Sequence, residues 1–342
     1  MPALDPQVEA LLEMSRKAGA RPFEVLTPAE ARAAYAAGWD VMQPATEEVA
    51  SVRDQAIPTS AGELPLRIYR GQGTQASEKL PCMVFLHGGG WVIGNLQSHD
   101  RLCRVIANRA RICVVAVDYR LAPEHRFPAA LDDSAAALQW VNANAAALSV
   151  DSARLAVGGD SAGGNLAAVL ALMGRDGTAP ATIFQALIYP VTDLTASSDA
   201  YQRVTSGVPL TAATMHYFID HYTPNAKDRH DWRASPLKAA SLKGTPPAMV
   251  VTVAHDPLCD EGRAYAKRLE DDGVRVTALH LGDHMHGMVM HGKLIAASNL
   301  VVNHIGAVIG DALHRGAPSR KTILAKPFTP KIRPTDSGEI HE

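Results

Sequence analysis

The sequence predicts an α/β fold, in which a mostly parallel sheet of about eight strands is flanked by helices and carries a separate helical cap. The first observation is that short apolar, β-branched runs alternate with Ala- and Leu-rich segments of helical period over residues 45–315. The second is that 342 residues, 47% of them hydrophobic and 20% charged, suffice for a large core. The third is that two segments, 1–44 and 196–232, do not fit the alternation.

The strands and helices follow from this alternation. Buried strands are expected at 82–88, 112–119, 155–159, 183–189, 248–254 and 274–281. Two weaker runs, near 48–56 and 64–70, precede them and are typical of an antiparallel edge pair. Helices are expected between the strands, the first opening on "SHD" and the second on a proline, at 99–110, 127–147, 162–174, 261–273 and 287–313.

The chain divides into a core, a cap and a tail. Residues 1–44 have a helical pattern, and residues 196–232 are rich in Tyr and Met but contain no strand pattern, so we expect them to form one cap. The core comprises residues 45–195 and 233–315. Residues 316–342 combine prolines with a polar end, which predicts a flexible C-terminal tail.

Composition and charge limit the class of partner. A net charge of −2, with no basic stripe, argues against nucleic acid or an acidic membrane surface and favours a small molecule. The N-terminus lacks a secretory pattern and no apolar run approaches the ~18 residues of a membrane span, so we expect a cytoplasmic protein, with a homodimer as its candidate assembly. The four cysteines show no metal-ligand spacing, and neither a disulfide framework nor a cofactor is expected.

The segment Gly159-Asp160-Ser161-Ala162-Gly163 is a G-x-S-x-G sequence between an expected strand and an expected helix. A serine at such a turn needs small neighbours because the backbone doubles back, and the following helix directs its positive end at any charge formed there. Ser161 is therefore the candidate nucleophile. The alternative is a glycine-rich turn whose serine only caps the helix.

Serine needs a base to take its proton and an acid to orient that base, both further along the chain. Asp256 follows the strand at 248–254, and His286 follows the last strand, so all three candidates lie at the carboxyl ends of parallel strands. Asp260 competes for the acid role, but it lies farther from the strand end. His284, with Asp283 and His291 nearby, could instead suggest a metal; we favour a position at the surface or behind the base.

The chain resembles the hormone-sensitive-lipase-like branch of the α/β-hydrolases, which includes many bacterial carboxylesterases. The resemblance rests on "HGGGW" at 87–91, "DYRLAPEHRFPAA" at 118–130, "GDSAGGN" at 159–165, "DPLCDEG" at 256–262 and "HG" at 286–287. It implies the α/β-hydrolase fold and a catalytic triad of Ser161, Asp256 and His286. One departure is Met288, which stands where the family usually has an aromatic residue.

The same resemblance gives a role to the glycines of "HGGGW". An oxyanion needs backbone N–H groups about 2.7–3.1 Å away, and glycines leave these amides accessible. By similarity, Gly89 and Gly90 supply two donors and Ala162 a third, while Gly88 shapes the loop as a further candidate and His87 anchors it. Four charged residues near these motifs are expected to have paired, structural roles: Asp118, Arg120, Glu124 and Asp160.

The expected function is therefore that of a serine carboxylesterase acting on short- to medium-chain esters through an acyl-enzyme, without metal or cofactor. An amidase or acyltransferase would share every catalytic residue. A ligand-binding receptor of the same fold is the other alternative, and the intact His286-Gly287 pair argues against it.

Overall fold

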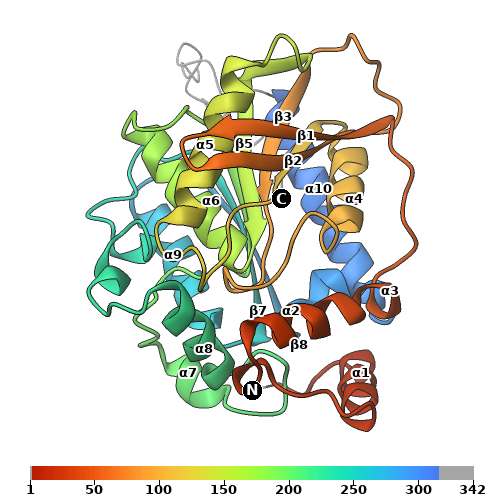
Figure 1. Cartoon of the computed structure of the whole chain (residues 1–342), viewed down its shortest axis with the longest axis vertical. Coiled ribbons are helices and arrows are strands. Elements are labelled where there is room, and N and C mark those ends of the chain that lie inside the picture. The colour runs from red at the N-terminus through yellow and green to blue at the C-terminus, as the bar shows by residue number, and fades with distance from the viewer. Residues whose placement is uncertain (1, 316–342) are drawn as a thin grey trace, which may run out of the picture.

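One eight-stranded sheet forms the centre of the computed structural model, which describes residues 2–315 (Figure 1). The predicted tail, 316–342, lies outside the described residues. Strand order is β1-β2-β4-β3-β5-β6-β7-β8, and the strands from β4 to β8 in this order run parallel. β1 and β2 pair antiparallel with each other, and β2 pairs antiparallel with β4. The predicted mostly parallel sheet and its antiparallel edge pair are confirmed.

All eight predicted strands are present, with ends that differ by a few residues from the apolar runs. Their bounds are β1 Ser51–Thr59, β2 Gly62–Arg70, β3 Leu80–Leu86, β4 Cys113–Val117, β5 Val150–Asp160, β6 Phe184–Ile188, β7 Ala248–His255 and β8 Val276–Met285.

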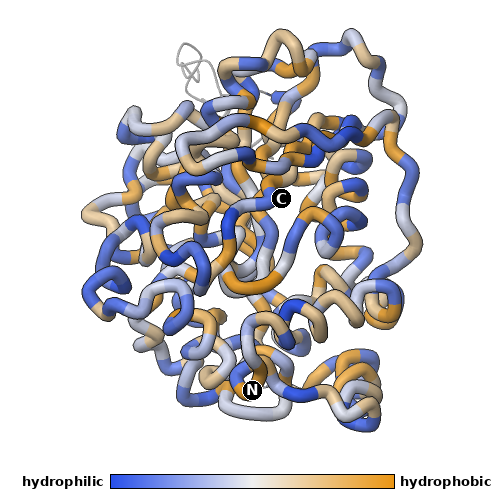
Figure 2. The backbone as a smooth tube through the Cα atoms, in the orientation of Figure 1, coloured by the Kyte–Doolittle hydropathy of each residue, from blue (hydrophilic) through white to orange (hydrophobic). Residues whose placement is uncertain are grey.

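Alternate residues of the inner strands pack on opposite faces of the sheet, as the period of two in a strand requires. In β3, Cys82, Val84 and Leu86 belong to the hydrophobic core on one face, together with residues of α5, α6 and α9. Met83 and Phe85 belong to the core on the other face, with α4 and α10. Figure 1 shows the two groups of helices on either side of the sheet, and Figure 2 shows hydrophobic residues along its strands.

The helices of the core lie close to their predicted positions, with one exception. They are α4 Asp100–Ala110, α5 Ala129–Ala143, α6 Ala162–Arg175, α9 Cys259–Asp271 and α10 Ala296–Arg315. The prediction that the last helix starts at residue 287 is wrong. Gly287 has φ +81°, a left-handed conformation that an α-helix cannot contain, and only a short 3₁₀ turn, Met288–Met290, follows it.

The segments 1–44 and 196–232 are mainly helical. Their α-helices are α1 Pro6–Lys17, α2 Pro28–Ala37, α3 Trp39–Met42, α7 Asp199–Arg203 and α8 Ala212–Tyr222. The two segments meet where the Phe23 and Phe218 ring centroids are 5.9 Å apart and where the Thr214 hydroxyl donates to Glu24 at 2.7 Å. Figure 1 shows α1, α2, α7 and α8 at the same end of the molecule.

Hydropathy of the helices gives one further observation. Within residues 2–315, none of the helices combines the length and the apolar character needed to cross a membrane.

Candidate active site

Ser161 occupies the sharp turn between β5 and α6. Its backbone has φ +55° and ψ −119°, a strained conformation for a residue with a side chain, and its side chain is almost buried. A Cβ atom at Gly159 or at Gly163 would overlap the carbonyl oxygen of Leu86 on β3. The turn therefore requires glycine on both sides of Ser161, as the G-x-S-x-G sequence predicts.

Ser161, His286 and Asp256 form a continuous chain of hydrogen bonds. The His286 Nε2 atom lies 2.9 Å from Ser161 Oγ, and His286 Nδ1 lies 2.7 Å from Asp256 Oδ2. Asp256 is wholly buried, and its other oxygen accepts the Leu258 amide at 2.8 Å. Because an ionised carboxylate only accepts, Nδ1 of the imidazole carries the proton, which leaves Nε2 free to accept from the serine hydroxyl.

Asp260, the competing candidate for the acid, has a different partner. Its carboxylate accepts from Arg203 at 2.7 Å and lies within the first turn of α9. The structure thus brings Asp256, and not Asp260, to the imidazole of His286.

His284 lies in the protein interior, so the predicted alternative of a surface position is wrong. It occupies β8, where the side chain faces the core, and it is 3% exposed. Its Nδ1 pairs with Asp283 at 2.7 Å, whereas His286 pairs with Asp256. The two histidines of the His-x-His sequence therefore have separate carboxylate partners, and residues 2–315 contain no group of three or more His, Cys, Asp or Glu placed to hold a metal ion.

The glycines after β3 form a tight loop beside Ser161. Gly89 and Gly90 have φ +116° and +57°, and a Cβ at Gly90 would overlap the ring of Phe218 on α8. Across the described residues, the amides of Gly89 and Gly90 donate to no protein acceptor. The Gly88 amide differs, since it donates to Asp160 Oδ1 at 2.9 Å.

A buried polar network lies behind this loop. Asp160 pairs with His99 Nε2 at 3.1 Å, and the Ser98 hydroxyl contacts His99 Nδ1 at 2.8 Å. Burial alone would raise the pKa of Asp160, but the charge and hydrogen bond of His99 lower it overall. The predicted structural role of Asp160, a paired carboxylate beside the nucleophile, agrees with this network.

His87 anchors the start of the loop by stacking. Its ring lies 4.2 Å from that of Tyr119 with an interplanar angle of 11°, and the Tyr119 hydroxyl donates to the His87 carbonyl at 2.6 Å. Burial lowers the pKa of His87 to about 3, so its imidazole is neutral at pH 7.

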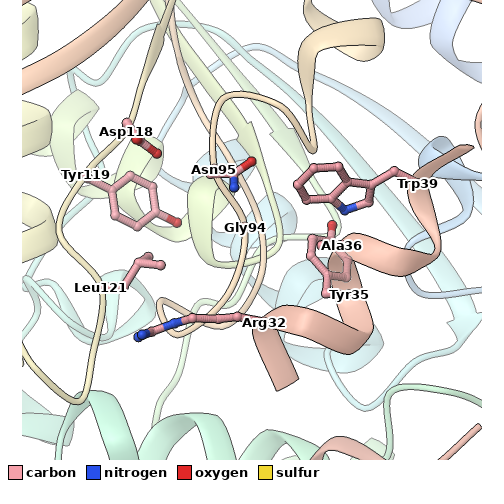
Figure 3. A pocket seen from close by; sticks show the side chains of 9 residues that line it. All are labelled: Arg32, Tyr35, Ala36, Trp39, Gly94, Asn95, Asp118, Tyr119 and Leu121. Atoms are coloured by element: carbon pink, nitrogen blue, oxygen red, sulfur yellow. The ribbon is translucent and has the colours of Figure 1, made fainter. Parts of the chain in front are cut away.

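The charged residues after β4 are mostly paired, as predicted. Arg120 forms an ion pair with Asp133 at 2.9 Å, and Glu124 pairs with Arg32 of α2 at 2.7 Å. Asp118 instead lines a cavity of about 250 Å³ between α2 and the loops after β3 and β4 (Figure 3). The cavity is lined by Arg32, Tyr35, Ala36, Trp39, Gly94, Asn95, Asp118, Tyr119 and Leu121, and it includes none of the triad.

Sequence analysis did not identify Tyr189 as part of the site. Tyr189 follows β6, is fully buried, and its ring centroid lies 4.4 Å from that of His286. Burial raises the pKa of its hydroxyl far above the usual range, so the hydroxyl stays protonated. Its position at the carboxyl end of an expected parallel strand is the signal the sequence offers, although in the pattern Tyr189 is simply the last residue of the run 183–189.

A serine, a histidine and a carboxylate, bonded in this order at the carboxyl ends of β5, β8 and β7, define a serine hydrolase of the α/β-hydrolase class. A family model described as "alpha/beta hydrolase fold" matches residues 83–290.

Known relatives specify the family further. Carboxylic ester hydrolase LipN of Mycobacterium tuberculosis (strain ATCC 25618 / H37Rv) is 38% identical over 314 residues, which cover 89% of this chain and 83% of LipN. Ethyl acetate hydrolase of Pseudomonas putida is 38% identical over 301 residues, covering 86% of this chain and 94% of that protein. A solved structure of a mutant of LAE6, an alpha/beta hydrolase enzyme from the metagenome of Lake Arreo, Spain, has a TM-score of 0.86 at 40% identity and covers 90% of this chain and 98% of its own.

The chain therefore belongs to the hormone-sensitive-lipase-like family of α/β-hydrolases, and it is a carboxylic ester hydrolase. This confirms the resemblance, the fold and the class of reaction predicted from the sequence.

Proposed function

We propose that the protein hydrolyses carboxylic esters by nucleophilic catalysis at Ser161. His286 takes the serine proton as Oγ attacks the ester carbonyl, and then gives it to the leaving alcohol, which produces an acyl-enzyme. Water, deprotonated by the same imidazole, releases the acid. Asp256 holds the imidazole and stabilises its charged form. The observation that carries the proposal is the hydrogen-bonded chain of 2.9 and 2.7 Å from Ser161 through His286 to Asp256.

The oxyanion formed in this attack is proposed to be bound by the amides of Gly89, Gly90 and Ala162. Support comes from the Gly89 and Gly90 amides, which donate to no protein acceptor in the described chain, and from Ala162, which begins α6 directly after Ser161. Gly88, the further candidate from the sequence, is left out of the proposed set. Its amide already donates to Asp160 and is not available to the substrate.

The substrates are proposed to be esters with acyl chains of about two to eight carbons, because each buried methylene is worth about 0.8 kcal/mol only until the pocket is full. The segments 1–44 and 196–232 are proposed to act as the cap that sets this limit, since Phe218 of α8 lies directly on Gly90. The relative that hydrolyses ethyl acetate supports the short-chain end of the range. The cytoplasmic location and the homodimer stay predictions.

The role of Ser161 is tested by Ser161→Ala. The variant should fold, and its turnover of p-nitrophenyl butyrate should fall by on the order of a million-fold, because the triad acts as a unit. Turnover within tenfold of the wild type would show that another residue is the nucleophile.

The substrate class is tested by kcat/KM across p-nitrophenyl esters from acetate to palmitate, with and without an emulsified triglyceride. A maximum between two and eight carbons and no activation by the emulsion are expected. A maximum at twelve carbons or beyond would indicate a lipase. Matched p-nitroanilides and an added alcohol acceptor test the amidase and acyltransferase alternatives in the same assay.

A further inference from the structure

The N-terminal residues reach the two strand ends that carry the acid and the base. The carbonyl of Pro2 accepts a hydrogen bond from His255 Nε2 at 3.0 Å. The Asp5 amide donates to the carbonyl of Asp283 at 2.9 Å, and the Gln7 side chain accepts from the amide of Ala296 at 2.8 Å. Residues 2–7 therefore bind the end of β7, the end of β8 and the start of α10.

These contacts converge on the last pair of residues in the β7–β8 ladder. His255 and Met285 are partners across the two strands, after an irregularity between Val253 and His255. The residues that follow them in the chain are Asp256 and His286. Any displacement of this last pair moves the acid relative to the base, because only one peptide unit separates each partner from its catalytic neighbour.

Helix α1 packs on Met285, the β8 member of this pair. Met285 is fully buried, and it packs with Val8 and Leu11 of α1 and with Ile295 in a separate small hydrophobic cluster. Apolar packing stabilises the position of Met285 but does not set the orientation of the strand end, because burial is non-directional. The hydrogen bond from His255 to Pro2 does constrain that orientation, because it requires a narrow range of angles. His255 thus provides a directional contact between the N-terminal segment and the end of β7, as the Asp5–Asp283 hydrogen bond does at the end of β8.

The state of the His255 imidazole suits this contact. The side chain is 7% exposed, and burial lowers its pKa, so the imidazole is neutral at pH 7. A carbonyl oxygen only accepts, so Nε2 carries the hydrogen and donates to Pro2. The hydrogen-bonded chain from Ser161 through His286 to Asp256 does not include this imidazole.

We propose that His255 is a positioning residue for the triad: its hydrogen bond to the Pro2 carbonyl fixes the last β7–β8 pair and, through it, the contact between Asp256 and His286. The proposal rests on the proposed role of the triad. It assigns a function to residues 2–7 as well, since they provide the acceptor.

The first test replaces the histidine. His255→Leu removes the donor, and His255→Gln keeps an N–H at the end of a side chain of similar reach. The control is His280→Leu, because His280 also bridges β7 and β8, through Thr252 Oγ1 at 2.9 Å, but lies six residues before His286. The readouts are kcat and KM for p-nitrophenyl butyrate and the thermal midpoint of each variant.

In His255→Leu, kcat should fall by about ten- to a hundredfold with KM within about twofold of the wild type, because a small displacement of catalytic groups costs this much in rate. His255→Gln should recover most of the loss, and His280→Leu should keep the wild-type kcat. Equal losses in His255→Leu and His280→Leu, or no recovery in His255→Gln, would overturn the proposal in favour of a purely structural histidine.

The second test removes the acceptor by deleting residues 2–3, which leaves Asp5 and α1 in place. The deletion should reduce kcat to the level of His255→Leu, and combining the two changes should cause no further loss, because they break the same hydrogen bond. If the fold-reduction in kcat of the combined variant equalled the product of the two single reductions, His255 would not act through Pro2. Ser161→Ala separates the two proposals: if it stays active the triad assignment fails, and if only the His255 variants behave as wild type the positioning role alone fails.

Discussion

At the scale of single residues, Asp256 just after β7 and Asp260 in the first turn of α9 are four positions apart in the chain but have different partners. Asp256 is wholly buried and bonded to the imidazole, whereas Asp260 is partly exposed and bonded to Arg203. A carboxylate that accepts from Nδ1–H selects one imidazole tautomer, and the corresponding amide can select the other. Two features of the sequence favoured Asp256: it lies nearer the strand end, and it aligns with the position of the acid in the family that the chain resembles.

Asp256→Asn should therefore reduce kcat by roughly 10⁴-fold with the fold intact. Asp260→Asn is the matched control and should stay within about threefold of the wild type, because an exposed pair with Arg203 is worth at most about 1 kcal/mol. Steady-state kinetics on both purified variants check the ranking. The reverse ranking would move the acid role to Asp260.

Gly89 offers a second comparison at this scale, with Gly62 as its control. The two glycines have nearly the same φ, +116° and +117°, so replacement by alanine imposes a similar backbone cost. A Cβ at Gly89 would overlap the Ile93 carbonyl, whereas one at Gly62, the first residue of β2, would meet nothing within 4 Å. Only the first substitution displaces the proposed oxyanion donors.

Gly89→Ala should lower kcat by about 100- to 1000-fold, the typical effect of losing one oxyanion donor. Gly62→Ala should keep the wild-type kcat while losing some stability. The measurements are kcat and the thermal midpoint for each variant. A Gly89→Ala enzyme with normal kcat would show that the oxyanion is bound elsewhere.

Sequence motifs predicted the triad because its members must follow strand ends in a fixed chain order. Gly88 and His255 show where such reasoning stops. The Gly88 amide points to Asp160, and the His255 ring meets Pro2, 253 residues away, and both facts depend on folded geometry. The three glycines of "HGGGW" have no side chains that distinguish them in the sequence.

At the scale of elements, α8 is the helix that packs on the glycine loop after β3. Its Phe218 side chain is 3% exposed, lies on Gly90, and contacts Phe23 of the N-terminal segment. The sequence indicated a helical segment here but not which residue would meet the glycine loop after β3. That contact depends on how the segments 1–44 and 196–232 dock, which no local pattern encodes.

Phe218→Leu should extend the range of acyl chains by giving room beside Gly90. We expect the ratio of kcat/KM for the octanoate over the butyrate ester to rise severalfold, because about 0.8 kcal/mol per additional buried methylene corresponds to roughly fourfold. Phe23→Leu is the control, since the Phe23 ring lies 5.9 Å from that of Phe218, whereas the atoms nearest to a Cβ built at Gly90 all belong to Phe218. An equal change in both variants would attribute the effect to looser packing instead of pocket length.

The last helix shows why element boundaries were predicted less well than elements. The apolar pattern continues from residue 287 into α10, which favoured one long helix. Gly287 adopts φ +81° because the chain turns sharply after His286, and the Gly287 carbonyl is bonded by the His291 ring at 2.8 Å. The base must project from a loop, and that requirement interrupts the helix until Ala296.

At the scale of the whole molecule, the order of buried strands along the chain was sufficient to predict a parallel sheet. Buried apolar runs separated by amphipathic helices leave few alternatives, because parallel strands need crossover connections. Folding also removes several histidines wholly or partly from water, and His87 and His255 are the two of the five named below that are buried. Burial lowers the pKa of His87, His221, His255, His280 and His291.

Buried neutral histidines make stability depend on pH with a definite sign. The pKa of His87 is about 3 in the folded protein and near 6.5 when exposed, so the unfolded chain binds more protons between these values. The stability that His87 provides is complete above pH 6.5 and is lost as the pH falls toward 3. Glu261 acts in the opposite sense, because burial raises the pKa of its carboxyl and its protonated form is the one the fold favours.

His87 should therefore lower the free energy of unfolding by about 2 kcal/mol between pH 7 and pH 5, since one pKa unit is worth about 1.4 kcal/mol, whereas Glu261 contributes in the opposite direction. His87→Asn removes the titrating group. The variant loses the stacking on Tyr119 at both pH values. Between pH 7 and pH 5, its free energy of unfolding should fall by about 2 kcal/mol less than that of the wild type. The measurement is urea unfolding at the two pH values, with the substitution of an exposed histidine, His304→Asn, as the control variant. If the free energy of unfolding changed equally with pH in His87→Asn and in the wild type, His87 would have to be protonated in the folded protein at pH 5. The buried imidazolium would then need a partner other than the Gly88 carbonyl to which its ring is bonded.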